Sequence, residues 1–254
     1  MEIPNNPKTL NEKILELNDK KYNSAGVLII NKYSNKDCVV LFKSSMYVPS
    51  GTNKGKYYCD IPGGGIDEKD FSLEQTASRE LYEESKKVFS ISISKLNTAR
   101  ETNSFVELPG RRLSGKRKPG LFGCYVIRLP HVSAKVYNIN KELLKKIKHD
   151  SVFYETNELI RIPISNIREY FADKKISDIR KQAEIKDIND NLQYITVQAS
   201  KCLFLACVKK QIEKKDDKII EKINSDNPFK LLEYKEVSND LIEGRNKGIT
   251  IKYF

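Results

Sequence analysis

No long hydrophobic run occurs in this sequence. The longest apolar segment, residues 202–208, is far shorter than the roughly 20 residues that a membrane-spanning helix needs. The first ten residues, MEIPNNPKTL, include the acidic Glu2 and lack the apolar stretch of a secretory signal. We therefore expect no membrane association and no export, and a cytoplasmic location.

Cysteine and histidine are also scarce. The five cysteines are odd in number and include no C-x-x-C pair, and His131 and His149 have no partner at a metal-ligand spacing. These absences argue against a zinc site and against a disulfide framework. We expect the cysteines to be reduced, packed thiols with no disulfide partner, and both histidines to be structural or surface residues.

Charged residues are abundant and unbalanced. The 254 residues include 45 lysines and arginines against 34 acidic residues, which gives a formal net charge of +11. A basic excess favours a polyanionic partner, because lysine and arginine gain affinity for phosphates by releasing counterions. The same composition also fits a solvated basic surface. Charge alone therefore leaves both interpretations open.

Short apolar runs alternate with helical patterns along most of the chain, which predicts a mixed α/β domain. Residues 25–32 and 37–43 predict two strands joined as a hairpin through the polar link 33–36. Further strands are expected at 57–61, 89–93, 104–108, 121–129 and 159–164. Helices are expected at 72–86, 141–148, 167–171 and 194–212.

The ends of the chain are expected to extend this domain. An amphipathic pattern near residues 10–17 predicts a short helix within an N-terminal extension, residues 1–22. The globular domain is assigned to residues 23–212, and residues 213–254 are expected to form a C-terminal extension packed on it. The lysine-rich stretch 209–222 carries isoleucines at near-helical spacing, which favours a surface helix or a linker over disorder.

The most informative stretch is 61–87, IPGGGIDEKDFSLEQTASRELYEESKK. Ser72 is a favourable N-cap, and Leu73, Ala77 and Leu81 recur every four residues as the inward stripe of a helix. A run of three glycines comes just before this helix. Because glycine has no side chain, backbone groups there can approach a metal ion or a phosphate closely.

Three glutamates of this helix form a candidate metal site. Glu80, Glu83 and Glu84 lie three and four positions apart, so that a helix carries their carboxylates on one side. Like charges in this arrangement repel unless cations neutralise them, and hard oxygen ligands suit Mg²⁺ or Mn²⁺. Arg79 precedes Glu83 by four residues, where it can pair with a carboxylate and fix its position. A solvated acidic helix face is the simpler alternative for the glutamates alone, but the preceding glycines favour a site.

The same residues resemble the box of the Nudix hydrolases, G-x5-E-x7-R-E-U-x-E-E-x-G-U, in which U is a bulky aliphatic residue. With Gly65 at the first position, the other matching residues are Arg79, Glu80, Leu81, Glu83 and Glu84. Three positions depart from the box. Phe71 replaces its upstream glutamate, and Lys86 and Lys87 replace its final glycine and aliphatic residue.

This resemblance implies a Nudix α/β/α sandwich with a mixed sheet, together with an N-terminal helix and helical C-terminal additions. It also implies an Mg²⁺- or Mn²⁺-dependent hydrolase of a nucleoside diphosphate linked to another group. By the same resemblance, Glu83 and Glu84 would be the principal metal ligands, and Glu80 would be a ligand or the base that activates water. The Gly64 carbonyl would complete the coordination, as in family members.

Further roles follow from the resemblance. Many relatives add an acidic ligand from a later loop, and Glu155 and Glu158 occupy the region where that residue falls. The upstream box glutamate supports the arginine, so its replacement by Phe71 leaves Glu68 or Glu74 as candidates for that support. Loss of the final box glycine is expected to affect the exit from the helix and to leave metal binding intact.

The flanking sequence bears on the substrate. Candidate RNA-binding residues gather in two basic clusters, a loop with Arg111, Arg112, Lys116, Arg117 and Lys118 and an expected helix with Lys141, Lys145, Lys146 and Lys148. Candidate rings for stacking on a methylated guanine are Tyr47, Tyr57, Tyr58, Phe105 and Phe122. Each cluster could instead be a solubilising surface, and each ring could belong to the core.

The form R-E-L-x-E-E-S, without the box glycine, is similar to the mRNA-decapping Nudix enzymes of large cytoplasmic DNA viruses. That resemblance would place the protein in the cytoplasm of a host cell. The first hypothesis is therefore an enzyme that acts on capped mRNA and releases a guanosine diphosphate, which would be methylated if the cap is.

Two alternatives remain open. One is a hydrolase of small substrates such as diphosphoinositol polyphosphates, dinucleoside polyphosphates or nucleotide sugars, because basic loops can equally clamp a small polyphosphate. The other is a catalytically silent Nudix module that binds RNA or protein, which only the departures from the box support. The sequence does not determine the oligomeric state.

Overall fold

The computed structural model describes residues 22–47, 54–109, 120–147, 153 and 155–208. All of them belong to the first of two units of the chain, Met1–Gln211. Several sequence predictions lie outside the described residues, among them the helix at 10–17, the basic loop at 111–118, the surface helix or linker at 209–222 and the C-terminal extension at 213–254.

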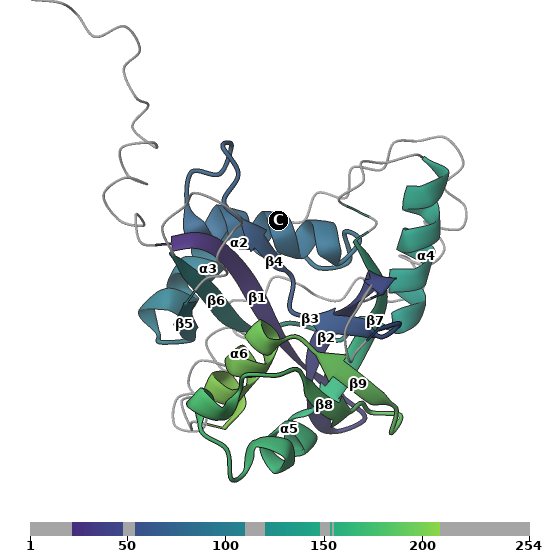
Figure 1. The fold of residues 1–254 in the computed structure, drawn as a ribbon. Helices are drawn as coiled ribbons and strands as arrows, with labels where there is room; N and C mark the ends of the chain where they lie inside the picture. Colours follow the sequence, from purple (N-terminus) through teal and green to yellow (C-terminus); the bar gives the residue numbers. More distant parts are fainter. Residues whose placement is uncertain (1–21, 48–53, 110–119, 148–152, 154, 209–254) are drawn as a thin grey trace, which may run out of the picture. The chain divides into compact units, whose positions relative to one another are not determined.

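One mixed sheet of nine strands forms the centre of the described residues (Figure 1). Seven strands follow in the order β5-β6-β1-β2-β3-β9-β8, while β4 pairs with β1 and β7 pairs with β2. Their bounds are β1 Tyr22–Tyr33, β2 Lys36–Tyr47, β3 Tyr57–Asp60, β4 Gly63–Gly65, β5 Phe105–Pro109, β6 Leu121–Arg128, β7 Thr156–Pro163, β8 Ala183–Lys186 and β9 Leu192–Ile195. Strand β1 runs parallel to β6 and β3 runs parallel to β9, while the other pairs are antiparallel.

The hairpin of β1 and β2 forms the middle of the sheet. Residues 27–30 and 38–42 are all buried, and successive residues of a strand point to opposite faces. Both faces must therefore be covered, which explains why the two strands read as continuous apolar runs. Ser34 and Asn35 form the expected turn, with positive φ values of 47° and 62° that a two-residue type I′ turn requires.

Helices cover the sheet on both sides. The helices that the structure describes are α2 Leu73–Glu84, α3 Ile93–Glu101, α4 Ala134–Lys146, α5 Ile164–Phe171 and α6 Val197–Cys207. Leu81 of α2, Leu96 of α3 and Tyr137 of α4 share one buried cluster with residues of β1 and β2. Helices α5 and α6 contact each other and lie on the other side of the sheet (Figure 1). The predicted α/β/α arrangement is confirmed.

Some element predictions are wrong. Residues 89–93 do not form a strand: Phe89 and Ile91 are buried from a loop, and the Ser92 side chain then caps α3 by accepting a hydrogen bond from the Lys95 amide. The buried residues alternate with polar ones, as in a strand, but this segment pairs with no strand of the described residues. The helix expected at 194–212 begins only after β9, and the helix expected at 141–148 begins earlier, at Ala134.

The five cysteines are free and buried, as predicted. Burial raises the pKa of Cys59 and of Cys207 to about 12, so that both thiols stay protonated at neutral pH. They therefore act as small packed side chains. Among the helices of the described ranges, none is long and apolar enough to cross a membrane.

Candidate active site

Helix α2 begins directly after the loop that follows β4. Ser72 caps it, as predicted, by accepting a hydrogen bond from the Gln75 amide (3.1 Å). The Gln75 side chain in turn accepts a hydrogen bond from the Phe71 amide (2.9 Å), so that two amides of the helix start are satisfied. The predicted apolar stripe is fully buried and consists of Leu73, Ala77 and Leu81.

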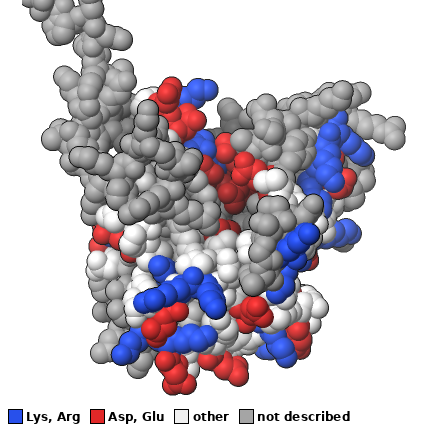
Figure 2. Space-filling view, viewed as in Figure 1, with Lys and Arg blue, Asp and Glu red and all other residues white. Residues whose placement is uncertain are grey.

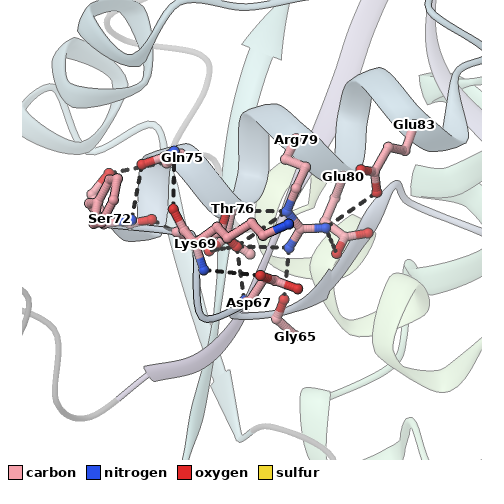
Figure 3. A network of polar contacts seen from close by, with 11 residues as sticks. Gly65, Asp67, Lys69, Ser72, Gln75, Thr76, Arg79, Glu80 and Glu83 are labelled. Atoms are coloured by element: carbon pink, nitrogen blue, oxygen red, sulfur yellow. Dashed lines mark hydrogen bonds and ion pairs between the residues drawn. The ribbon is translucent and has the colours of Figure 1, made fainter. Parts of the chain in front are cut away.

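The acidic residues lie on another face of α2. Figure 2 shows Asp and Glu side chains gathered in a hollow over α2, with Lys and Arg side chains along the neighbouring α4. The side chains of Glu80 and Glu83 are 13% and 21% exposed. Both point toward Arg79 (Figure 3). The helix thus presents carboxylates in a partly enclosed place that water and a ligand can still reach.

Arg79 joins this acidic face to the glycine turn. Its guanidinium donates hydrogen bonds to Glu80 (2.8 Å), to Glu83 (3.2 Å) and to the carbonyl of Gly65 (3.0 Å). The pairing with Glu83 that the four-residue spacing predicts is therefore present. Because the guanidinium is planar and its donors are fixed, these contacts hold the two carboxylates in defined positions.

Asp70, in the loop before the helix, accepts hydrogen bonds from Arg79 and so holds its guanidinium in place. Arg79 donates from Nη2 to one Asp70 oxygen (2.8 Å) and from Nε to the other (3.1 Å). Asp70 also accepts hydrogen bonds from the Asp67 amide (2.9 Å) and the Thr76 hydroxyl (3.0 Å). Burial opposes its ionisation, but the hydrogen bonds, that of Arg79 foremost, hold the pKa of Asp70 below its ordinary value.

The prediction that Glu68 or Glu74 supports the arginine is wrong. Glu68 is exposed. Glu74 instead pairs with Arg100 (3.1 Å) and accepts a hydrogen bond from the Tyr125 hydroxyl (2.6 Å). Asp70 takes the supporting role of the upstream box glutamate, although it lies one position before it in the sequence. Phe71, which occupies the box position itself, is 43% exposed.

The glycines of β4 bring the backbone against α2. A β-carbon at Gly64 would lie 2.3 Å from a carboxylate oxygen of Glu80, and one at Gly63 would lie 2.8 Å from the Ala25 carbonyl oxygen. A side chain at either position would require the structure to shift. The close approach that the glycine run predicts is present, and it places backbone atoms beside the Glu80 carboxylate.

Burial raises the pKa values of all three glutamates. It raises the pKa of Glu80 to about 7, although Arg79 opposes this shift. The pKa of Glu83 is raised for the same reason and against the same opposition. The pKa of Glu84 lies well above its ordinary value because of burial and then repulsion from nearby carboxylates. A bound cation would stabilise the charged forms of all three groups.

Two residues outside α2 add to this charge. Asp60, at the end of β3, and Glu155, just before β7, both raise the pKa of Glu84 by charge repulsion. Glu155 also acts on Glu80 and Glu83. Glu155 and Glu158 are both exposed, and Glu158, the other candidate of this region, pairs with Lys43 (3.3 Å). We call the interacting set the acidic cluster; it consists of Asp60, Glu80, Glu83, Glu84 and Glu155.

The acidic cluster fits a hard divalent cation by its chemistry. It offers oxygen ligands only, and their mutual repulsion in a partly buried place favours a positive charge. Within the ranges that the structure describes, no three acidic, histidine or cysteine side chains converge closely enough to hold a metal ion as they stand. The hydrogen bonds from Arg79 to Glu80 and Glu83 keep oxygens of both groups engaged. Mg²⁺ or Mn²⁺ would compete with Arg79 for them.

Helix α2 ends in a Schellman motif that contains two lysines. The Lys86 amide bonds to the Glu83 carbonyl (3.1 Å) and the Lys87 amide bonds to the Tyr82 carbonyl (2.8 Å). Both lysines have left-handed backbones, with φ values of 60° and 63°. The first of these positions favours glycine, which explains the glycine of the box. Lys86 is fully buried, and burial lowers its pKa to about 8.

A cleft of about 200 Å³ opens beside the glycine turn. Its polar lining comes from Asn23, Ser24, Asp60 and Gln198, and one ring, that of Phe122, also lines it. Asp60 belongs both to this cleft and to the acidic cluster, so the two adjoin. Sequence reasoning missed three of the polar residues, because Asn23, Ser24 and Gln198 lie in no recognisable motif.

The basic candidates are only partly described. Lys145 and Lys146 are exposed on α4, and Lys145 pairs with Glu142 (3.0 Å). Lys141 of the same helix bonds to the Asn157 carbonyl (3.0 Å). The candidates outside the described residues are Arg111, Arg112, Lys116, Arg117, Lys118 and Lys148.

The other aromatic and histidine candidates have structural surroundings. Phe105 packs against Tyr125, with ring centroids 4.8 Å apart, and Tyr57 is 39% exposed on β3. His131 packs against Tyr33 at 5.1 Å, as expected of a structural residue. Among the candidate rings whose side chains the structure describes, only Phe122 lines the cleft.

Comparison with known families agrees with this arrangement of glycines, arginine and glutamates. The model of the NUDIX domain matches residues 21–117. This stretch of the chain, less than half of its length, therefore has the sequence pattern of a Nudix domain. The matched stretch includes strands β1 to β5 and helices α2 and α3, whereas β6 and all later elements follow it. The sheet that begins in the matched stretch is thus completed by residues beyond it.

Several solved structures are similar to this chain at low sequence identity. An Ap4A hydrolase of C. elegans is 17% identical over 57% of this chain and 82% of its own, with a TM-score of 0.33. The NUDIX domain of Shewanella oneidensis NrtR, solved with ADP ribose, is 15% identical over 62% and 85%, with a TM-score of 0.35. A mutT/nudix family protein from Listeria innocua is 16% identical over 81% and 98%, with a TM-score of 0.32.

Values this low do not identify a substrate. Among curated proteins, none matches the chain.

Proposed function

We propose that this Nudix domain hydrolyses a pyrophosphate linkage and that its acidic cluster holds Mg²⁺ or Mn²⁺. The observation that supports this most is the position of Glu80. Its carboxylate lies against the backbone of Gly64, bonds to Arg79 and has a pKa raised to about 7. The family match and the oxygen-only ligand set support the same chemistry.

The residues of the cluster take distinct parts in this chemistry. Glu83 and Glu84 would hold the metal ion together with the Gly64 carbonyl. When bound, the ion would neutralise the charge that develops on the phosphate oxygens. Burial raises the pKa of Glu80 to about 7, so this carboxylate would be a suitable base to accept a proton from the attacking water. Asp70 acts through Arg79, which keeps Glu80 and Glu83 in place.

The cleft supports a nucleoside derivative as the substrate. The amides of Asn23 and Gln198 and the carboxylate of Asp60 offer hydrogen-bond donors and acceptors for the edge of a base, and Phe122 offers an apolar wall. Because the cleft adjoins the acidic cluster through Asp60, a base bound there would place its diphosphate near Glu80 and Glu84.

Within this class we propose the 5′ cap of mRNA as the substrate, with release of a guanosine diphosphate. The net charge of +11 and the lysines of α4 beside the acidic hollow support a path for the RNA chain beyond the cleaved end (Figure 2). Under this proposal the basic residues of the loop 111–118 would contact the RNA, and the protein would act in the cytoplasm of a host cell.

The second candidate is a hydrolase of small nucleoside diphosphate derivatives. The small size of the cleft, about 200 Å³, favours it, because such a cleft holds one base or sugar without needing a polymer. Capped RNA and small diphosphates share the same bond cleavage. The two candidates differ in whether the protein also binds an RNA chain beyond the bond that it cleaves.

One assay separates these substrates. The full chain is incubated with Mn²⁺ and, in parallel, with cap-labelled RNA, free cap analogue and a panel of small diphosphates. We expect release of a guanosine diphosphate from capped RNA. Faster turnover of a small diphosphate would favour the second candidate, and RNA binding without turnover of any substrate would favour a silent binding module.

The same assay tests the site. Glu83→Gln is expected to reduce turnover by a factor of about 100 or more and to leave RNA binding nearly unchanged. Glu158→Gln is the matched control, because Glu158 is exposed and paired with Lys43. Equal turnover of Glu83→Gln and the parent protein would contradict the proposed site.

A further inference from the structure

Lys86 combines two unfavourable features. Its backbone is left-handed, with φ of 60°, in a position where glycine has no steric cost. Its side chain is fully buried, and its Nζ has no hydrogen-bond partner among the described residues. A buried ammonium without a partner is costly, because it has lost its contacts with water. Such a residue is best explained by what its charge does.

The surroundings of Lys86 place this charge beside the acidic cluster. The acidic groups whose charges act on it are Glu84 and Glu155. Asn140 of α4 donates a hydrogen bond to the Lys86 carbonyl (3.1 Å), and Thr156 of β7 donates one to the Glu84 carbonyl (2.6 Å). Lys86 therefore lies where the end of α2, α4 and the start of β7 meet, on the α4 side of the cluster.

Two basic residues of α2 and its C-terminal turn are associated with different carboxylates of the cluster. Arg79 bonds directly to Glu80 and Glu83. The charges of Glu84 and Glu155 raise the pKa of Lys86 against the larger effect of burial, and the charge of Lys141 lowers it. The Lys141 ammonium is bound to Asn157, however, through hydrogen bonds of 3.0 and 3.2 Å.

We infer that the buried Lys86 ammonium is a counter-charge of the acidic cluster that limits how tightly the cluster binds divalent cations. This inference rests on the proposed function, because it requires the cluster to be a cation site. A fixed positive charge beside Glu84 and Glu155 repels an incoming Mg²⁺ or Mn²⁺ and offsets part of the charge that attracts it. A site that holds its cation less tightly also releases a product bound to that cation more readily.

The neighbouring Lys87 provides a matched control. It shares the left-handed backbone, with φ of 63°, and also follows the glutamates of α2. Its ammonium, however, lies over the ring of Phe153 (4.9 Å) and near that of Tyr82 (5.8 Å). Removing this charge alters the same backbone motif and leaves the buried Lys86 ammonium in place.

The test measures Mn²⁺ binding to the full chain at neutral pH by electron paramagnetic resonance. Lys86→Met removes the charge and keeps a long side chain at the left-handed position. Lys86→Gly also removes it and introduces the residue that the backbone favours, which protects against a failure to fold. We expect both variants to bind Mn²⁺ about tenfold more tightly than the parent protein, and Lys87→Met to bind it equally. The Mn²⁺-induced rise in melting temperature should be larger for both Lys86 variants.

Two results would overturn the inference. If both Lys86 variants bind Mn²⁺ as the parent does, or more weakly, Lys86 is not a counter-charge, although the proposed hydrolase remains possible. If the parent protein binds no Mn²⁺, the inference and the proposed function both fail.

Discussion

Arg79 and Lys86 both bring a positive charge to helix α2, but the structure treats the two charges differently. Arg79 is bonded to three carboxylates and one carbonyl. The ammonium of Lys86 is buried and has no hydrogen bond within the described residues. The first charge fixes geometry through direct bonds. The second can act only through its electric field. A field acts over a longer distance than a hydrogen bond but does not fix the direction of the contact.

This comparison suggests how the site is divided. The start and middle of α2 form a rigid support, in which each charge of Asp70 and Arg79 is satisfied by hydrogen bonds. At the end of the helix, Glu84 is buried near other carboxylates, and the Lys86 ammonium has no hydrogen bond among the described residues. A cation is expected near Glu84, because repulsion among these carboxylates favours a positive charge there.

The largest expected effect comes from breaking the support. Asp70→Asn removes a buried carboxylate that holds the Arg79 guanidinium at two of its nitrogens. We expect the free energy of unfolding to fall by about 3 kcal/mol, because the Arg79 guanidinium loses the most deeply buried of its three carboxylate partners. Turnover should fall as well, because Glu80 and Glu83 lose their fixed neighbour. Denaturation with guanidinium chloride measures the first effect and the capped-RNA assay the second.

Two further variants sharpen this experiment. Glu68→Gln changes an exposed carboxylate of the same loop and should leave stability within about 0.5 kcal/mol of the parent. Adding Phe71→Glu to Asp70→Asn supplies a carboxylate at the box position and should restore part of the lost stability. An Asp70→Asn variant as stable as the parent would show that Arg79 needs no such support.

A smaller effect is expected from the pH dependence of the metal-free protein. The pKa of Glu80 is raised from 4.5 to about 7, so the folded state binds this proton more tightly than the unfolded state does. The stabilisation from this proton is present below about pH 4.5 and is lost as the pH rises through about 7. Glu83 and Glu84 shift in the same direction, and Asp70 in the opposite one.

Thermal unfolding in EDTA at a series of pH values measures this loss. Glu80→Gln should flatten the pH dependence by about 2 kcal/mol between pH 4.5 and 7. Mn²⁺ should restore stability at the upper end of this range in the parent protein. A metal-free protein that becomes more stable over the same range, with or without Glu80, would contradict the pKa assignment.

The smallest effect separates two glutamates near the start of β7, Glu155 just before the strand and Glu158 within it. Glu155 acts on the glutamates of α2, whereas Glu158 pairs with Lys43. Glu155→Gln should weaken Mn²⁺ binding about tenfold, which is about 1.4 kcal/mol, and Glu158→Gln should leave it unchanged. Calorimetric titration measures both. Equal affinities in the two variants would remove Glu155 from the cluster.

The sequence predicted the acidic face of the site better than its support. A helix places residues 80, 83 and 84 on one side wherever it lies in the fold, so the grouping follows from spacing alone. The role of Asp70 depends on how the loop before the helix folds back, and no spacing rule gives that path. The burial of Lys86 likewise depends on α4 and β7, which are distant in the sequence.

The same distinction explains the errors in the fold. The long apolar runs of β1 and β2 predicted their strands correctly, because burial on both faces leaves a strong pattern. Strands β8 and β9 have four residues each and carry charged or polar side chains. The pairing of β8 with β9 and of β9 with β3 stabilises them as strands, and local sequence contains little of that information.

The partners of the central strands have a practical consequence for work with fragments. A protein cut at residue 117, the end of the family match, would lack the neighbours that β1, β2 and β3 find in β6, β7 and β9. Each of these three strands would then present unpaired amides and carbonyls, which invite pairing with other molecules. Such a fragment would be prone to aggregate, and a usable one should extend at least through Cys207.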